Sequence, residues 1–281
     1  MNAVAIIPAR YGSTRFPGKP LLRETGKYLI QHVYERVAAA RRITRCLIAT
    51  DDERIAAAVA EFGGQAVMTR PDHPSGTDRI AEVVRKHPGD ADDIILNVQG
   101  DEPEIDPTAL DRLVARLEAE VGPASLPAAA GTEARPTYPV ATLACPFAPD
   151  ADPRDPNAVK VVTNLRGHAL YFSRSLLPYV RSQAADAQAG IRPWLLHLGV
   201  YAYRRAFLLE YAGWEPTPLE TLEKLEQLRI LEHGVPLAVE LVERASPGVD
   251  TPEDYARFVA RWRARTEPAA GRAARGAFGG A

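Results

Sequence analysis

The 281-residue sequence is poor in cysteine, in long apolar runs and in net charge, and each shortage excludes something. Its two cysteines, Cys46 and Cys145, lie far apart in apolar segments, which predicts buried free thiols rather than a disulfide or a metal site and fits a reducing cytoplasm. No stretch reaches the ~18–20 apolar residues of a membrane-spanning helix, and the apolar N-terminus is more typical of a buried strand than of a signal peptide. A net charge of -2 gives no overall basic excess for a nucleic acid or a membrane.

Lysine is scarce as well, because only five of the 34 basic residues are Lys and 29 are Arg. Lys19 stands out in a Gly/Pro-rich turn, and Lys160 stands out in an apolar segment that is typical of a strand. An inward-facing lysine needs a partner, so we expect Lys160 to lie near the metal or phosphate of an active site.

The first half of the chain alternates segments of two kinds. Apolar runs typical of strands buried on both faces lie at 3–8, 45–49, 65–68 and 94–98. Segments with helical spacing lie at 28–40, 53–62, 77–86 and 107–120, and Thr77 or Asp78 could cap the third of them. This order predicts an α/β fold with a Rossmann-like, doubly wound, mainly parallel sheet.

The second half is less regular. Residues 121–138 are rich in Pro, Ala and Gly without periodicity, and we expect a flexible surface loop there. Strands are then expected at 140–145, 159–163, 169–172, 199–203 and 237–242, and helices at 219–233 and 251–263. The low-complexity residues 265–281 are expected to be a disordered tail.

Three cations lie close together in the loop that follows the first expected strand. Residues 9–20 contain Arg10, Arg15 and Lys19 with two glycines, at the sheet edge where open α/β folds bind ligands. These cations and the backbone N–H groups could hold a polyphosphate, although a solvated basic turn is the alternative. Neither GxxxxGK[ST] nor GxGxxG is present, which argues against a P-loop and against a nicotinamide site.

The stretch IIPARYGSTRFPGKPL resembles the signature loop of the sugar-activating nucleotidyltransferases, in particular the 3-deoxy-manno-octulosonate (Kdo) cytidylyltransferases, or CMP-Kdo synthetases. Further similar segments follow in the family's order: ATDD, TRPDHPSGTDR, NVQGDEP, PNAVKVV, ALYFSR, HLGVYAYRR, PLETLEKLEQLRILEHG and GVDTPEDY. Together they cover about residues 3–260. The Pro/Ala-rich segment at 121–138 looks longer than the family pattern requires.

The resemblance implies a mixed, mainly parallel sheet of the nucleotide-diphospho-sugar transferase type with a smaller sugar-binding and dimerisation subdomain. It implies one domain over residues 1–264. Residues 1–120 and 235–264 would form the nucleotide-binding part, and residues 139–234 the sugar-binding part. A homodimer is implied as well.

Two aspartates are implied as ligands of Mg²⁺, namely Asp101 in the QGDEP turn and Asp250 in GVDTP. A carboxylate after a strand and facing a phosphate loop suits Mg²⁺, which takes one or two carboxylates plus phosphate oxygens and water. For Asp250 the residues themselves favour a helix N-cap. Glu102 is expected to be a turn residue rather than a ligand.

Two groups of binding residues follow from the resemblance. The nucleotide would contact Ala9, Arg10, Ser13, Thr14, Arg15, Lys19, Ser75, Gly76, Thr77 and Gln99, although the Thr77 hydroxyl could cap a helix instead. The sugar acid would contact Arg174, His197, Tyr201, Glu223, Glu226 and Gln227, although the two glutamates could face solvent and His197 could be a structural residue.

The implied reaction is CTP + Kdo giving CMP-Kdo + diphosphate, with the 2-hydroxyl of Kdo attacking the α-phosphorus. Arg10, Lys19, Asp101 and Asp250 would be the catalytic residues, and positioning and electrostatics would supply the catalysis. A CMP-sialate synthetase, an enzyme specific for 8-amino-Kdo, another sugar nucleotidyltransferase and a non-catalytic nucleotide-binding module are the alternatives.

Overall fold

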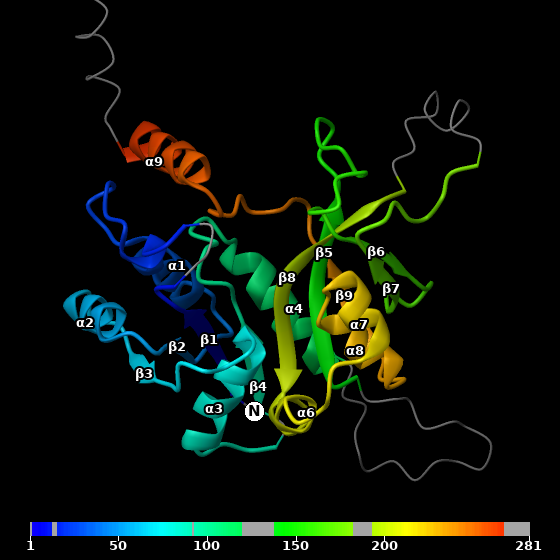
Figure 1. Cartoon of the computed structure of the whole chain (residues 1–281), viewed down its shortest axis with the longest axis horizontal. Helices are drawn as coiled ribbons and strands as arrows, with labels where there is room; N and C mark the ends of the chain where they lie inside the picture. The colour runs from blue at the N-terminus through cyan, green and yellow to red at the C-terminus, as the bar shows by residue number, and fades with distance from the viewer. Residues whose placement is uncertain (1, 13–15, 92, 120–137, 182–192, 267–281) are drawn as a thin grey trace, which may run out of the picture.

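One continuous mixed sheet of nine strands runs through the protein, whose computed structural model describes residues 2–12, 16–91, 93–119, 138–181 and 193–266 (Figure 1). Its principal strand order is β3-β2-β1-β4-β8-β5-β9. The first four strands in sequence are all parallel: β1 (Ala3–Ala9), β2 (Arg45–Thr50), β3 (Ala66–Met68) and β4 (Ile94–Asn97). The mostly buried side chains of β1, β2 and β4 explain why these strands appear in the sequence as apolar runs, whereas β3 is half-buried and ends at the exposed Met68.

The second half joins this sheet through a single long strand, β8 (Leu195–Arg204), which is antiparallel to both β4 and β5 (Val140–Pro146). At the far edge, β9 (Leu237–Leu241) runs parallel to β5 and so lies beside the strands of the predicted sugar-binding part. The short strands β6 (Lys160–Thr163) and β7 (Ala169–Ser173) form an antiparallel pair, and β6 also pairs with β8.

Helices cover both faces of the sheet, as the predicted doubly wound fold requires. Side chains of α1 (Leu29–Ala38), α2 (Glu53–Glu61) and α4 (Pro107–Ala119) pack in one core. Side chains of α3 (Gly76–Lys86), α6 (Arg205–Tyr211) and α8 (Gln227–Glu232) pack in a second core. The predicted α/β class with a mixed, mainly parallel sheet is confirmed.

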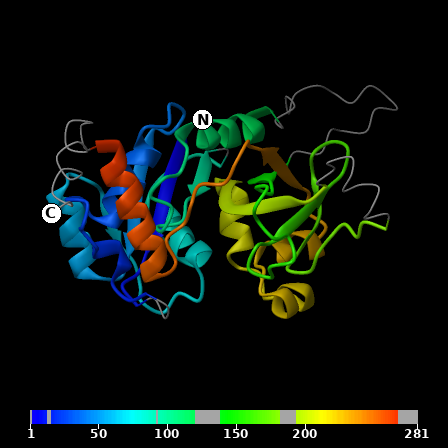
Figure 2. The same ribbon diagram turned by 90° about the horizontal axis from the view of Figure 1, so that it is seen from above.

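The last helix, α9 (Pro252–Thr266), returns from the second half of the chain to the first. In Figures 1 and 2 the connection after β9 crosses between the halves, and α9 lies beside α1. The contact is apolar, since Tyr255, Phe258 and Val259 form a small core with Leu29. This crossing brings the residues just before α9 to the edge of the first half.

Several boundaries differ from the sequence-based predictions. The single helix expected at 219–233 is two short helices, α7 (Pro218–Glu223) and α8, separated by Lys224 in a left-handed conformation with φ 54°. Helix α6 and the 3₁₀ turn η1 (Lys19–Leu21) were not expected, and β8 begins four residues before the expected strand.

Two predicted flexible segments are partly ordered. Tyr138, the last residue of the predicted loop, is buried and packs against His168 with the ring centroids 4.0 Å apart. The helix α9 includes residues 265 and 266 of the predicted tail. The other residues of both segments, 121–137 and 267–281, lie outside the described part of the chain. Within the described part, no helix has the length and apolar character needed to cross a membrane.

Candidate active site

The loop after β1 places Lys19 between two carboxylates. Gly18 adopts a left-handed conformation with φ 72°, where L side chains are strained, and its N–H donates to the Tyr11 carbonyl at 2.9 Å. This tight turn directs Lys19 inward, where its Nζ lies 2.7 Å from Asp101 Oδ2, 3.6 Å from Asp250 Oδ1 and 2.9 Å from the carbonyl oxygen of Val249. Lys19 therefore contacts both predicted metal ligands.

The backbone fixes the two aspartates in place. The amide of Val249, the residue before Asp250, donates to the Asp101 carbonyl at 2.8 Å, which joins the turn after β4 to the segment before α9. The N-cap role considered for Asp250 belongs to Thr251, whose Oγ1 accepts from the Asp254 amide at 3.2 Å. The alternative of a cap is therefore wrong for the Asp250 carboxylate, which approaches Lys19 instead.

Glu102 follows Asp101 and has a different environment. Burial and the neighbouring Asp101 charge raise the pKa of Glu102 to about 8, so its carboxyl is mainly protonated at neutral pH. A protonated carboxyl is a poor metal ligand, which agrees with its exclusion from the predicted ligand set.

A cavity of about 110 Å³ lies at the carboxyl end of β1. It is lined by Pro8, Ala9, Arg10, His73, Ser75, Gly76, Arg79 and Gln99, which include five of the predicted nucleotide contacts. A close backbone approach shapes this edge, because a Cβ on Gly100 would lie 2.9 Å from the Pro8 carbonyl oxygen. Ser13, Thr14 and Arg15 lie outside the described residues.

The caps of α3 differ from the prediction. The hydroxyl of Ser75, not of Thr77 or Asp78, caps this helix by accepting from the Asp78 amide at 3.2 Å. Thr77 is buried, and its hydroxyl lies within hydrogen-bonding reach of the Glu226 carboxylate and the Tyr203 hydroxyl. Arg79 is buried too and pairs with Asp51 (2.9 Å) and Thr69 (2.6 Å), which agrees with a structural role.

A second cavity, of about 240 Å³, adjoins the first. Its lining is rich in hydroxyl and amide groups and comprises Gly76, Thr77, Asn97, Gln99, His197, Gly199, Tyr201, Tyr203, Tyr211, Leu225, Glu226 and Gln227. Gly76 and Gln99 line both cavities, and Gln99 is held by a 3.2 Å hydrogen bond from its Nε2 to the Gly199 carbonyl. The structure therefore brings together four of the six predicted sugar contacts: His197, Tyr201, Glu226 and Gln227.

His197 is neutral in this cavity. Burial lowers its pKa to about 3. Thr142 donates its hydroxyl proton to the Val200 carbonyl at 2.8 Å, so its oxygen accepts from Nε2 of His197 at 3.1 Å. This tautomer leaves Nδ1 as a hydrogen-bond acceptor.

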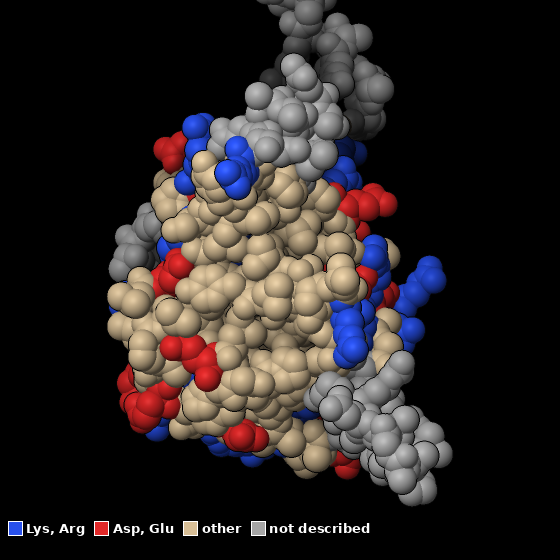
Figure 3. Space-filling view, turned by 90° about the vertical axis from the view of Figure 1, so that its right-hand side faces the viewer, with Lys and Arg blue, Asp and Glu red and all other residues tan. Residues whose placement is uncertain are grey.

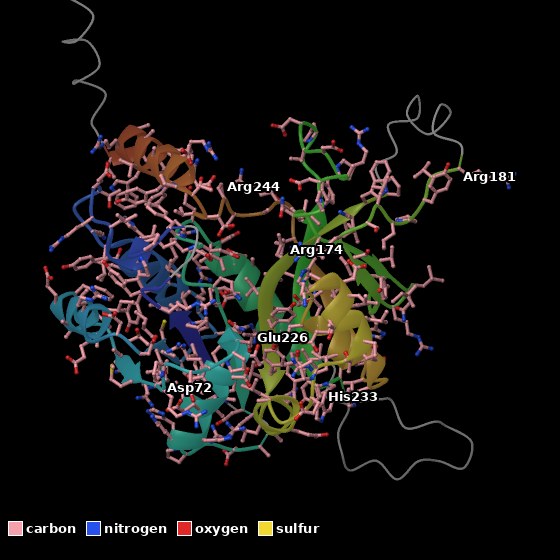
Figure 4. The ribbon with its side chains drawn as sticks, viewed as in Figure 1. Asp72, Arg174, Arg181, Glu226, His233 and Arg244 are labelled. Atoms are coloured by element: carbon pink, nitrogen blue, oxygen red, sulfur yellow. The ribbon has the colours of Figure 1, made fainter. Side chains whose placement is uncertain are left out.

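Glu226 owes its position to the break between α7 and α8. The Tyr211 hydroxyl donates to its carbonyl at 2.9 Å and lies 3.2 Å from its Oε1. Burial raises the pKa of Glu226, and the Thr77 hydroxyl and the Arg229 charge oppose that rise. Figure 4 shows Glu226 between β4 and α8.

Two other predicted sugar contacts do not line this cavity. Arg174 donates to the carbonyls of Glu223 (2.7 Å) and Pro156 (2.9 Å), and the Glu223 carboxylate accepts from Ser173 and from the Arg174 amide. Figure 4 shows Arg174 apart from Glu226, near β5 and β6. Both side chains hold β7 to α7 in this structure.

The expectation for Lys160 is wrong. Its side chain is fully buried and donates to the carbonyls of Asp155 (3.0 Å) and Arg174 (2.5 Å). Lys160 therefore stabilises the backbone around β6 and β7 rather than contacting the Asp101–Asp250 pair.

The sequence reasoning missed Asn97, Tyr203 and Tyr211. Asn97 is directly opposite Tyr201 in the β4–β8 register, so their side chains share a face of the sheet. The signal was present in the sequence, because Asn97 is the only polar residue of the run IILNV. Tyr211 could not be found because helix α6 was not predicted.

A larger hollow, of about 610 Å³, lies on the other face of β8. Alternation along the strand directs His197, Tyr201 and Tyr203 into the 240 Å³ cavity and Leu198 and Val200 into this hollow. Its lining includes none of the predicted site residues, and Figure 4 shows one lining residue, Arg244, on the connection before α9. The predicted residues that line a cavity therefore line the two smaller ones and not this hollow.

Comparison with known proteins gives a consistent result. The family profile described as cytidylyltransferase matches residues 4–241. A 3-deoxy-manno-octulosonate cytidylyltransferase of Syntrophotalea carbinolica is 49% identical over 267 residues, with 94% of this chain and 99% of that protein covered. The enzyme of the same name from Vibrio cholerae is 47% identical over 256 residues, with 90% and 95% covered.

Solved structures agree with these relatives. A CMP:2-keto-3-deoxy-manno-octonic acid synthetase complexed with CTP superposes with a TM-score of 0.82 at 42% identity, covering 94% of this chain and all of that one. A cytidylyltransferase from Leptospira borgpetersenii, at 16% identity, matches with a TM-score of 0.60 over 95% of this chain and 89% of that one, and it shares the fold alone.

Proposed function

The chain belongs to the cytidylyltransferase family, among the 3-deoxy-manno-octulosonate cytidylyltransferases, and from that premise we propose how its site works. The reaction is CTP + Kdo giving CMP-Kdo + diphosphate, a step of lipopolysaccharide biosynthesis. The reduced thiols Cys46 and Cys145 support a cytoplasmic location.

The observation that carries this proposal is the pair of adjoining cavities. Nucleotide binds at the carboxyl end of β1, against Ala9, Arg10 and Gln99, and the sugar acid occupies the neighbouring cavity. Because Gly76 and Gln99 line both cavities, a sugar hydroxyl in one cavity would lie close to the α-phosphate in the other. Ligands of open α/β sheets bind at such strand ends.

Asp101 and Asp250 suit a magnesium ion. They already share one cation, the Lys19 ammonium group, at 2.7 and 3.6 Å. No cluster of three or more His, Cys, Asp or Glu that could hold a metal occurs among the described residues. A magnesium ion on the two aspartates would be completed by phosphate oxygens and water. When bound, Mg²⁺ would neutralise phosphate charge at the reacting phosphorus.

The residues of the chain position the reactants and offset charge. Arg10 and Lys19 offset the charge of the departing diphosphate, and Arg15 of the same loop would add a third cation. His197, Tyr201, Glu226 and Gln227 orient the sugar so that its anomeric hydroxyl is in line with the phosphorus. No covalent enzyme intermediate is required, so neither cysteine has a catalytic role.

Diphosphate release from ATP, CTP, GTP and UTP, each with Kdo and Mg²⁺, tests this function. We expect diphosphate release with CTP and not with ATP, GTP or UTP. The Asp101→Asn variant should lose turnover by at least ~10³-fold, because charge stabilisation of the transferred phosphoryl group would fail. Glu118→Gln, which neutralises an exposed carboxylate paired with Arg42, is the matched control and should retain full turnover.

Other outcomes select the alternatives. CTP-dependent turnover of sialic acid or 8-amino-Kdo but not of Kdo would indicate a different sugar specificity. No release with any nucleotide and sugar acid, together with CTP binding, would indicate a non-catalytic module.

We also propose a homodimer through the face that carries β7 and α7. Figure 3 shows this side of the molecule as largely uncharged, with charged side chains mainly at its margins. The elements on this side leave Leu165, Leu170 and Leu222 exposed at 107%, 61% and 78%. A second copy with the same apolar surface would cover them in a symmetric dimer. Light scattering should give twice the 30.6 kDa chain mass, and the chain mass itself in a Leu170→Glu/Leu222→Glu variant.

A further inference from the structure

Two buried polar atoms in the 240 Å³ cavity have no hydrogen-bond partner among the described residues. They are Oδ1 of Asn97 and Nε2 of Gln227, on side chains that are only 4% and 5% exposed. Asn97 enters from the end of β4 and Gln227 from the start of α8, so two separate elements each direct an unpartnered amide group into one space.

Such atoms are uncommon, because an unpaired buried polar atom costs about 1–3 kcal/mol, whereas an apolar side chain of similar shape avoids that cost. Asn97 is also exceptional within its own strand. Ile94, Ile95 and Leu96 before it are apolar and at most 2% exposed. Asn97 is thus the one polar residue of β4, and its buried amide, which faces the cavity, is best explained by a ligand group that donates a hydrogen bond to Oδ1.

The chemistry of the two atoms defines that ligand group. The amide oxygen only accepts hydrogen bonds, and the amide nitrogen only donates them. A charged ligand group is disfavoured at these two amide atoms. The neighbouring His197 is neutral, and the Glu226 carboxylate already interacts with Tyr211 and Thr77. Hydroxyl groups both donate and accept without bringing charge into a buried site.

We infer that Asn97, beside the already proposed sugar contact Gln227, completes a hydroxyl-binding subsite that determines which sugar the enzyme accepts. A sugar hydroxyl donates to Oδ1 of Asn97, and a hydroxyl oxygen accepts from Nε2 of Gln227. Asn97 is thus a specificity residue for the cytidylyl transfer, and this inference rests on the proposed function.

Asn97→Leu tests the subsite, because it keeps the volume and removes the acceptor. We expect the KM for Kdo to rise about 10- to 100-fold, as for a lost buried hydrogen bond, with the KM for CTP unchanged. The ligand-free thermal midpoint should stay level or rise, since the unpaired atom is gone. Gln227→Met should give the same pattern, and Gln65→Met, an exposed amide remote from the cavity, should match the wild type.

A panel of mono-deoxy Kdo analogues separates the subsite from the function itself. The wild type should discriminate against one analogue by a similar factor, and Asn97→Leu should lose that discrimination. A fall in the ligand-free thermal midpoint with unchanged KM for Kdo would overturn the subsite and make Asn97 a structural residue. If the wild type still converts Kdo and CTP in that experiment, only the subsite is overturned and the proposed function is retained.

Discussion

Lys19 is the residue that offsets the negative charge of Asp101 and Asp250 in this structure. Its ammonium group lies 2.7 Å from Asp101 and 3.6 Å from Asp250, and its own side chain is only 12% exposed. The Lys19 ammonium group thus offsets charge on both carboxylates. If CTP and a divalent cation bind as proposed, the cation would take over the two carboxylates and the Lys19 side chain could turn to phosphate oxygens, in keeping with its proposed role on the nucleotide.

Lys19→Met tests this balance without measuring activity. Removal of the cation should lower the free energy of unfolding by about 1–2 kcal/mol in metal-free buffer, between the values for exposed and buried pairs. Added Mg²⁺ should raise the thermal midpoint of the variant more than that of the wild type, because the ion replaces the lost charge. Lys27→Met, which breaks the exposed pair with Glu35, is the control and should respond to Mg²⁺ as the wild type does. An identical Mg²⁺ response in all three proteins would contradict the shared-cation account.

At the scale of elements, the docking of α9 on α1 decides where Asp250 lies. His32 of α1 is buried and lies edge-on to Phe258 (5.0 Å) and Trp262 (4.4 Å) of α9. Thr25 donates its hydroxyl proton to the Lys27 carbonyl, so His32 Nε2 donates to Thr25 at 2.6 Å as a neutral ring. Burial lowers the pKa of His32 to about 4.

The stability of this contact should therefore fall in mild acid. Because the folded pKa of about 4 is below the ordinary value of 6.5, the unfolded chain binds the proton more tightly. The stabilisation is complete above pH 6.5 and is lost as the pH falls toward 4, by about 2 kcal/mol at pH 5. Urea unfolding at pH 7 and pH 5 should show that His32→Leu loses less stability than the wild type over this interval. Equal losses would show that His32 does not contribute.

The strands and helices also differ in how well the sequence alone could predict them. Strands β1, β2 and β4 follow from apolar runs, because strands buried on both faces leave that pattern whatever surrounds them. The break at Lys224 could not be predicted, since the Glu and Leu spacing of 219–233 suits one helix. Tertiary contacts decide it: Glu223 is held by Ser173 and Glu226 by Tyr211, and these partners come from distant elements.

Some features of the candidate site could be predicted from the sequence, and others could not. Family-like segments located Lys19, Asp101 and Asp250, and the structure brings these three together. They did not reveal that Ser75 caps α3 or that Arg174 is bound to backbone carbonyls. Such contacts depend on side-chain directions that no spacing rule provides.

At the scale of the whole molecule, the long antiparallel strand β8 makes the two halves one site. It pairs with β4 of the first half and with β5 of the second, and its two faces line different hollows. The α9 connection then returns Asp250 to Asp101. The two adjoining cavities, proposed to hold nucleotide and sugar, and the Asp101–Asp250 pair thus draw on residues between positions 8 and 250.

A crystal structure with CTP and Mn²⁺, read by the anomalous signal of manganese, tests this account most directly. The account predicts a manganese peak in contact with both Asp101 and Asp250, with the CTP phosphates over the loop of residues 10–19 and the base beside Gln99. A peak that touches neither carboxylate, or CTP bound in the 610 Å³ hollow behind β8, would contradict it.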